Sequence, residues 1–176
     1  MVGISRLRFA RISSALAVAS VLSVMLATAA TATGPVVHHV TAGGPDACEA
    51  LGLKPGCDGN FSLAAREYAD GSVKGQYTDR FANGNGFHAV IDCVSVVGND
   101  AWLSGVITSG GFTDPDTGET FDFTGLPVAT RVRDNGTSAN DPADQISFSI
   151  IGDPTPCTDQ TPYDLLDLSQ GQVRVT

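Results

Sequence analysis

The sequence predicts an all-β fold, an antiparallel meander of seven to eight strands that forms a barrel or a sandwich. Short runs of β-branched and aromatic residues alternate with polar ones, and turn residues interrupt them at roughly ten-residue spacing. No long stretch shows the 3.6-residue periodicity of a helix. Because most connections are of hairpin length, neighbours in sequence are expected to be neighbours in the sheet.

Residues 87–108 are predicted to form the hairpin at the centre of the sheet. Two runs, 87–97 and 101–108, flank a turn of residue types that tolerate positive φ, Gly98-Asn99-Asp100. The hairpin carries the only tryptophan, Trp102. Apolar residues fall on both faces of both runs, so we expect the hairpin to lie in mid-sheet with little of it facing water.

The remaining strands follow the same alternation. The clearest lies at residues 146–150, where isoleucine and phenylalanine alternate with serine. Residues 110–120 are expected to be a polar loop, followed by a short edge segment at Phe121 and Phe123. Further strands are predicted at residues 61–66, 73–78, 128–133 and 172–175.

Residues 1–32 have the pattern of a secretory signal peptide. Its basic residues are Arg6, Arg8 and Arg11. An apolar stretch follows at residues 12–26, and Ala30-Thr31-Ala32 is favoured over Ala27-Thr28-Ala29 as the cleavage site. The apolar stretch is too short and too rich in serine for a retained membrane anchor. We therefore expect a secreted, extracellular protein without a membrane anchor after cleavage.

Residues 33–58 are expected to be a flexible leader in front of a single β-domain of residues 59–176. The first part of the leader is rich in glycine and proline. It contains His38-His39, a pair without a third ligand nearby, which favours a solvated segment over a metal site. The length that remains suits one domain and not two.

The chain is acidic, with 10 Lys and Arg against 19 Asp and Glu and a net charge of −9. Cleavage of the signal peptide removes three arginines, which leaves seven basic residues against 19 acidic ones, a net charge of −12. The electrostatic field of such a negative net charge repels phosphate backbones and anionic lipids. We therefore expect no nucleic-acid partner and no membrane-surface binding. An extracellular or cell-wall partner stays open, and the sequence identifies none.

The four cysteines, Cys48, Cys57, Cys93 and Cys157, are predicted to form two disulfides, because an even number in an exported chain indicates pairing. Three pairings are possible. Cys48–Cys57 suits a staple of a short loop in the leader, and Cys93–Cys157 would tie the central hairpin to the C-terminal third. No Cys-x-x-Cys pair is present, which argues against a zinc or redox site.

Several motifs together resemble a widespread, uncharacterised group of small secreted bacterial β-domains. The motifs are Asp-Gly-Ser-x-x-Gly at 70–75, the run at 96–108, Arg-Val-x-Asp-Asn-Gly at 131–136, Asp-Gln-Ile-Ser at 144–147 and Gly-Gln-Val-Arg-Val at 171–175. They are also distantly similar to post-COAP-1-type modules. The resemblance implies a β-fold and export. Since that group has no established activity, it assigns no catalytic or binding residue.

Asp114, Asp116 and Glu119 are the candidate metal ligands. They stand in Asp-Pro-Asp-Thr-Gly-Glu, and alternating acids followed by glycine can place oxygen atoms around Ca²⁺. The segment lacks the distal bidentate Glu of a full calcium loop, and its dipeptides also suit an ordinary turn. A turn is favoured, calcium is the alternative, and no other cofactor is expected. A second acidic loop, residues 134–144, has the same two interpretations.

The sequence identifies no catalytic residues. It has no Gly-x-Ser-x-Gly elbow, and His88 is the one histidine of the predicted β-domain, which argues against a triad or a three-histidine zinc site. The favoured function is a secreted non-catalytic β-module with a binding or extracellular structural role. The alternative is a barrel that holds a small apolar ligand in a cavity lined by aromatic side chains, including Trp102. A carboxylate-based secreted hydrolase ranks third.

Overall fold

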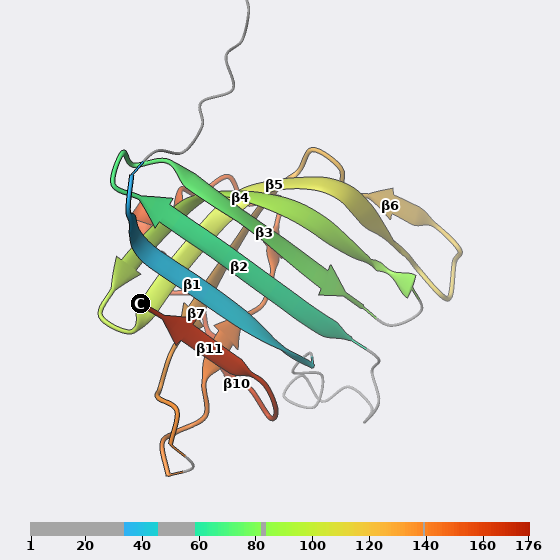
Figure 1. Ribbon diagram of the computed structural model, residues 1–176. Coiled ribbons are helices and arrows are strands. Elements are labelled where there is room, and N and C mark those ends of the chain that lie inside the picture. Colours follow the sequence, from blue (N-terminus) through green and yellow to red (C-terminus); the bar gives the residue numbers. More distant parts are fainter. Residues whose placement is uncertain (1–33, 46–58, 82–83, 139) are drawn as a thin grey trace, which may run out of the picture. The chain divides into compact units, whose positions relative to one another are not determined.

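A computed structural model describes residues 34–45, 59–81, 84–138 and 140–176, and it confirms the all-β fold (Figure 1). One short 3-10 helix, η2 (Cys157–Asp159), accompanies the described strands. The strands are β1 (Val36–Pro45), β2 (Asn60–Tyr68), β3 (Val73–Arg80), β4 (Gly86–Val97), β5 (Asp100–Thr113), β6 (Thr120–Asp122), β7 (Pro127–Arg133), β8 (Gln145–Ser147), β9 (Ile150–Ile151), β10 (Leu165–Asp167) and β11 (Gln172–Val175). In these ranges no helix is long and apolar enough to cross a membrane.

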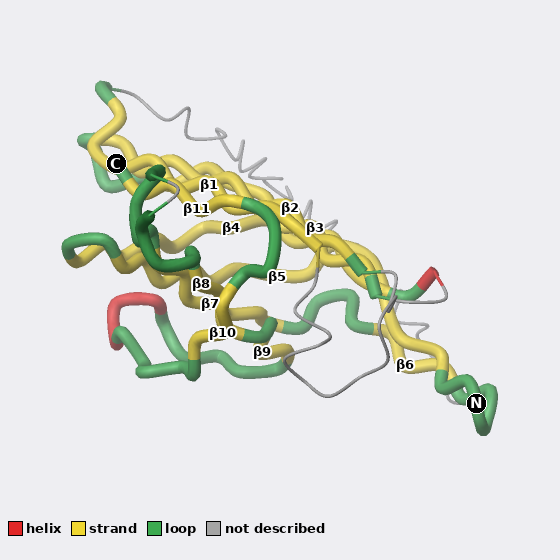
Figure 2. The backbone as a smooth tube through the Cα atoms, turned by 90° about the horizontal axis from the view of Figure 1, so that it is seen from below, coloured by secondary structure: helices red, strands yellow, loops and turns green. Residues whose placement is uncertain are grey.

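The strands form one antiparallel sheet in the order β10-β8-β7-β5-β4-β3-β2-β1-β11, with β6 on β5 and β9 on β7. Sequence neighbours are sheet neighbours through most of this order, as the short connections predict. Two short strands, β6 and β9, lie off this path, so β5 pairs with β7 and β8 pairs with β10. The long-range exception is β11, which returns beside β1 from the far end of the chain. The sheet curls into a half-barrel, seen from below in Figure 2.

The β4–β5 hairpin lies at the centre of the sheet, as predicted. Its two faces differ more than the sequence indicates. Leu103 and Ile107 are each 1% exposed and face the core, whereas Val90 and Val106, which pair across the strands, are 52% and 43% exposed. The expectation that little of the hairpin faces water is therefore wrong for its outer face.

The core fills the concave side of the half-barrel. Alternate residues of each long strand point inward, and most of them are aliphatic or aromatic. The largest fully buried side chains are Tyr77, Leu63, Ile91, Leu103, Ile107, Val40, Val128, Val132 and Val173. Tyr77 and Phe87 meet edge to face, with ring centroids 5.2 Å apart.

Residues 36–45 correct the prediction of a flexible leader. They form β1, which pairs with β2 on one side and with β11 on the other. Val40 is fully buried and Ala42 is 6% exposed, so this segment contributes to the core. The β-domain therefore begins before residue 59. The predicted Cys48–Cys57 staple lies outside the described residues.

Two smaller expectations also fail. Residues 146–150 are not one strand: 146–147 end β8, 150 begins β9, and 148–149 lie between them. Ser147 Oγ accepts from the Arg131 N–H (2.9 Å) and donates to the Phe148 carbonyl (3.0 Å). These local bonds interrupt the ladder between the two short strands. Residues 110–113, expected in a loop, continue β5.

A bulge in β4 determines where Cys93 points. Phe87, Ala89 and Ile91 face the core, but the register with β5 shifts between Ile91 and Cys93. Beyond the shift Val94 takes the inward position, and Cys93 lies on the outer face. There it bonds to Cys157, which confirms the predicted disulfide between the hairpin and the C-terminal third.

Residues 153–163, which include η2 and which we call the strap, cross the outer face of β4, β5 and β7. Besides the disulfide, Trp102 Nε1 donates to the Thr161 carbonyl (2.8 Å) and Gln160 Nε2 donates to Ser95 Oγ (3.1 Å). Trp102 alternates with the inward Leu103 and is 8% exposed under the strap. It therefore does not line the barrel interior as the ligand-cavity hypothesis expected.

Carboxylates fasten the free edge of β11. The backbone N–H and C=O groups of residues 172, 174 and 176 point toward β1. The N–H groups of Val173 and Val175 therefore point to the open edge of the sheet. The Val173 N–H donates to Asp144 Oδ2 (2.7 Å) and the Val175 N–H donates to Asp134 Oδ2 (3.0 Å). We call this junction of β11 with the segment after β7 the seam.

Replacing Asp144 with alanine is expected to destabilise the protein by about 2–3 kcal/mol, because two backbone donors then lose a charged acceptor. These donors are the N–H groups of Val173 and Asn135. The matched control is Asp141→Ala, whose carboxylate accepts from the exposed Ser138 N–H and should cost less than about 1 kcal/mol. Urea unfolding of both variants measures the difference, and equal losses would contradict the structural role of the seam.

Removing the disulfide with Cys93→Ala and Cys157→Ala is expected to destabilise the protein by roughly 4 kcal/mol in the chain-entropy model. The two cysteines are 64 residues apart, which makes the closed loop long. The strap covers Trp102, so loss of the disulfide should expose this side chain to water. The fluorescence emission of Trp102 should therefore shift to the red in the folded variant. A folded variant with unchanged emission would show that the strap stays closed without the bond.

Candidate functional site

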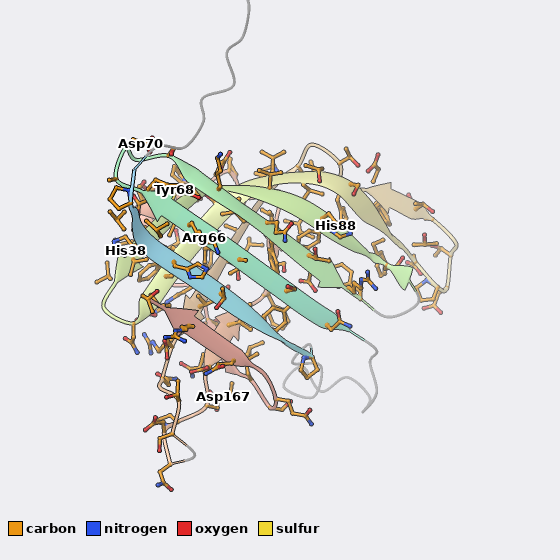
Figure 3. The ribbon with its side chains drawn as sticks, in the orientation of Figure 1. His38, Arg66, Tyr68, Asp70, His88 and Asp167 are labelled. Carbon is orange, nitrogen blue, oxygen red and sulfur yellow. A yellow bond between two sulfur atoms is a disulfide. The ribbon has the colours of Figure 1, made fainter. Side chains whose placement is uncertain are left out.

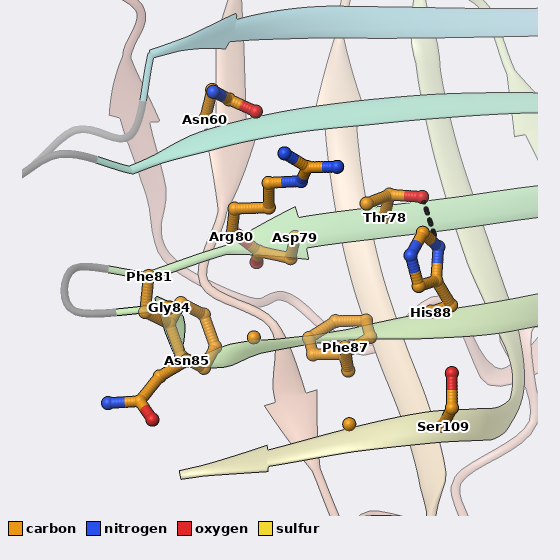
Figure 4. A pocket seen from close by; sticks show the side chains of 12 residues that line it. Asn60, Thr78, Asp79, Arg80, Phe81, Gly84, Asn85, Phe87, His88 and Ser109 are labelled. Carbon is orange, nitrogen blue, oxygen red and sulfur yellow. Dashed lines mark hydrogen bonds between the residues drawn. The ribbon is translucent and has the colours of Figure 1, made fainter. Parts of the chain in front are cut away.

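A polar pocket lies at the ends of β3 and β4 (Figure 4). It encloses about 580 Å³ and opens to solvent. Its lining is rich in hydrogen-bonding side chains, with the ring of Phe81 and the glycines Gly84, Gly86 and Gly110 between them. The polar residues of the lining are Asn60, Thr78, Asp79, Arg80, Asn85, His88 and Ser109, of which Asp79 directs its side chain to the inner face.

The sheet register explains why these side chains meet. Thr78 on β3 pairs with His88 on β4, and His88 pairs with Ser109 on β5, so three polar side chains share one row of the outer face. The next row holds Asn60 and Arg80, and Arg80 pairs with Gly86. Gly86 lets β4 approach β3 closely in that row, because a Cβ at this position would lie 2.2 Å from the Asp79 carbonyl oxygen.

His88 is held by one neighbour in this pocket. Its Nδ1 lies 2.8 Å from Thr78 Oγ1, as the dashed line in Figure 4 shows. Asp92 shares the exposed face of β4 but is four residues further along the strand. No hydrogen bond or ion pair joins His88 to a carboxylate in the described part of the chain. The arrangement presents polar groups that can form hydrogen bonds with a ligand.

A buried polar network lies next to the pocket, on the inner face. Asp79 is 6% exposed, and its Oδ2 accepts from Ser149 Oγ (2.5 Å) and from the Tyr77 hydroxyl (3.1 Å). The two hydroxyl groups are themselves 2.7 Å apart. The network ties β3 to the segment between β8 and β9, so these hydroxyl groups are committed to Asp79.

A second polar cluster binds β5 to β7. Asp100 Oδ1 accepts from Arg131 Nη2 (2.7 Å), and Asp100 Oδ2 accepts from Arg133 Nη2 (3.0 Å). The Arg131 guanidinium lies 5.0 Å from the ring centroid of Trp102 and donates to the Tyr163 carbonyl (3.4 Å). Both arginines are thus paired, and the cluster supports the strap.

The predicted metal ligands do not assemble into a site. Asp114 Oδ1 accepts from the N–H groups of Asp116 (2.8 Å) and Thr117 (3.2 Å), and these backbone bonds hold the pKa of Asp114 below its usual value. Glu119 closes the turn through its carbonyl, which accepts from the Asp114 N–H. Within the described ranges no three His, Cys, Asp or Glu side chains form a group that could hold a metal ion. Calcium binding here stays a prediction from the sequence.

The second acidic loop is occupied by structural bonds. Besides the seam, Asp134 Oδ1 accepts from the Gly136 N–H (3.0 Å), and Asp144 Oδ1 accepts from the Asn135 N–H (2.8 Å). Asp141 Oδ2 accepts from the Ser138 N–H (2.8 Å). Turn and edge chemistry therefore accounts for these acids.

A set of exposed cations was missed by the sequence analysis. Arg66, Lys74, Arg80 and Arg174 all occupy outward positions of β2, β3 and β11. We call the outer surface of β11, β1, β2 and β3 the basic face; Figure 3 labels Arg66 on it, with His88 on neighbouring β4. The period-two alternation could have placed each cation outward, but the register that brings them together is not visible in the sequence.

Comparison with known proteins adds no relative. No protein-family model matches the chain, no curated protein matches it, and no solved structure matches it.

The strap contains a carboxylate whose titration should be measurable. Asp153 Oδ1 accepts from Thr155 Oγ1 (2.5 Å) and from the Thr155 N–H (2.9 Å), and Oδ2 accepts from the Tyr163 hydroxyl (2.9 Å). The bonds from Thr155, then that from Tyr163, lower the pKa of Asp153 below 3.8. Burial, followed by the bond to Asp153, raises the pKa of Tyr163.

A lowered folded-state pKa means that Asp153 contributes stability above pH 3.8 and loses that contribution as the pH falls through the folded-state value. Asp153→Asn should therefore be less stable than the wild type at about pH 7, and the difference should shrink toward about pH 2. Urea unfolding at several pH values measures it. A difference that stays constant with pH would show that the ionised carboxylate is not what matters.

Proposed function

We propose that the protein is a secreted non-catalytic β-module that acts by binding, with the polar pocket of β3 and β4 as its ligand site. The observation that carries this proposal is the presentation of Asn60, Thr78, Arg80 and His88 on one outer face. Strand pairing fixes their backbones, so little ordering is needed when a ligand binds. The side chains include charged and neutral hydrogen-bonding groups, which suit a ligand with many hydroxyl groups, such as a sugar.

Export is supported from two sides. Residues 1–32 have the basic start, apolar stretch and small-residue cleavage site of a signal peptide. The Cys93–Cys157 disulfide is of the kind that persists in oxidising compartments. A small secreted bacterial β-domain, which the sequence motifs resemble, fits both features.

A binding role is favoured over catalysis because the best-placed acids already hold the fold together. Asp79 holds Tyr77 and Ser149, Asp100 holds two arginines, and Asp144 holds the seam. General acid–base chemistry needs a carboxyl or imidazole group within reach of a substrate proton. His88 alone meets that condition in the pocket, and one unassisted imidazole does not make a hydrolytic pair.

The test uses short sugar oligomers, both neutral and carboxylate-bearing, in calorimetric titration against the purified protein. Binding of at least one of them is expected, and His88→Ala should weaken it about tenfold, which corresponds to one hydrogen bond worth about 1.4 kcal/mol. The control is His38→Ala, a histidine of β1 that lies outside the pocket lining and pairs with Glu67.

The same mixtures are assayed for release of reducing ends. No turnover is expected from the wild type. Turnover that disappears on substitution of a single carboxylate would replace the binding module with the hydrolase, and equal binding by both histidine variants would remove the pocket from the proposal.

A further inference from the structure

We propose that the basic face binds an acidic polysaccharide, a polymer whose sugars carry carboxylate groups, and that the polymer continues into the polar pocket. This inference rests on the proposed sugar-binding function and extends it to a substrate class. Three observations support it: the distribution of charged side chains, the unfavourable cross-strand pair of Arg66 and Lys74, and the neutral hydrogen-bonding side chains between the cations.

Among the described residues, the cations of this face form no ion pair, while Arg131 and Arg133 do. Within the described residues, ion pairs join only Arg131 and Arg133 to an acid, Asp100 in both cases. Arg66, Lys74, Arg80 and Arg174 are exposed. Among the outward positions of β11, β1, β2, β3 and β4, Asp92 is the one acid. An otherwise acidic protein therefore presents one surface of positive charge.

Two of these cations stand directly opposite each other. Arg66 on β2 pairs with Lys74 on β3, and His39 on β1 follows in the same row. Like charges directly opposite on a sheet destabilise it. This arrangement therefore contributes nothing to the fold, but a bound anion lying across β2 and β3 would be attracted by both side chains.

The acids of the protein lie largely in other elements. Residues 100–176 contain 12 of the 19 acids, in the loops and strands from β5 onward. At physiological ionic strength the screening length is about 8 Å, so distant acids act weakly on an anion that touches the basic face. Local attraction can therefore prevail over the repulsion expected from net charge.

The groups between the cations select the polymer. The rows between Arg66 and Arg80 hold four neutral hydrogen-bonding side chains, those of Thr41, Ser62, Gln76 and Thr78, together with the small residues Gly43 and Ala64. Single-stranded nucleic acids are bound by stacking on a series of aromatic rings, whereas these rows contain one imidazole, His88, and no Phe, Tyr or Trp. Duplex DNA carries a charge about every 1.7 Å, far denser than the cations here. A polymer with spaced carboxylates and hydroxyl groups between them matches this surface better.

The size of the basic face suits several sugars in a row. Lys74 and Arg80 are six residues apart on β3, a distance of about 20 Å at the rise of a strand. Arg80 also lines the polar pocket. One polymer can therefore contact the Arg66–Lys74 pair and the pocket together.

The experiment measures binding of polygalacturonate by affinity electrophoresis and calorimetry. The wild type should bind it, binding should weaken as salt increases, and fully methyl-esterified polygalacturonate should bind much less. Arg66→Gln with Lys74→Gln should weaken binding by about 1.5- to 5-fold per removed charge, the strength of an exposed ion pair. The same double variant should keep or raise the melting temperature, because it removes a like-charge pair.

The charge-matched control compares Arg174→Gln on the basic face with Arg133→Gln on β7. Both variants lose one positive charge, but only the first should weaken polymer binding. Equal weakening would mean that net charge alone matters and would overturn the proposal. Tighter binding of duplex DNA or of phosphatidylglycerol vesicles than of polygalacturonate would overturn the choice of polymer.

The pocket and the basic face can fail separately. If His88→Ala weakens binding of short oligomers while the Arg66–Lys74 double variant binds the polymer normally, the pocket stands and the basic face does not. If neither the wild type nor any variant binds sugars, both the proposed sugar-binding function and the basic-face proposal fail.

Discussion

A curled sheet that does not close leaves strand edges, and the structure depends on how one of them is fastened. The outward N–H groups of Val173 and Val175 on β11 donate to Asp144 and Asp134. Without these acceptors the edge would expose unpaired donors, which invite pairing with another chain. Because β11 holds β1 in place, and β1 contributes Val40 to the core, the seam supports the whole concave side.

The seam also shows why acidic residues were difficult to interpret from sequence. Asp134 and Asp144 are close in sequence, and their pattern predicts a turn or a cation-binding loop. Their carboxylates instead accept hydrogen bonds from backbone N–H groups of β11, about 30–40 residues later in the chain. Local turn chemistry could be predicted for Asp114, where the bonds run to Asp116 and Thr117. The role of a carboxylate follows from sequence only when its partners are near it in the chain.

The strands that alternate clearly were predictable, and those that depend on distant partners were not. Residues 73–78 and 128–133 fall in β3 and β7, where one face is apolar and the other polar. Residues 36–45 carry small residues, glycines and a proline, and their strand forms because β2 and β11 pair with both sides. Likewise, only the register could show that the bulge after Ile91 turns Cys93 outward, or that Arg66 meets Lys74.

The outer surface of the sheet has two halves with different physical roles. Over β4, β5 and β7 the strap covers Trp102 and is held by a disulfide, by Arg131 and by the strap's own Asp153–Tyr163 bond. Over β11, β1, β2 and β3 no described segment covers the sheet in this way. Apart from Val36, Val37 and Pro45 at the two ends of β1, the exposed side chains there are cationic or neutral hydrogen-bonding groups. A protein that covers its outward tryptophan while leaving a like-charge pair exposed presents a surface suited to an anionic, hydroxyl-rich partner. The uncovered half is therefore the half where binding should be sought.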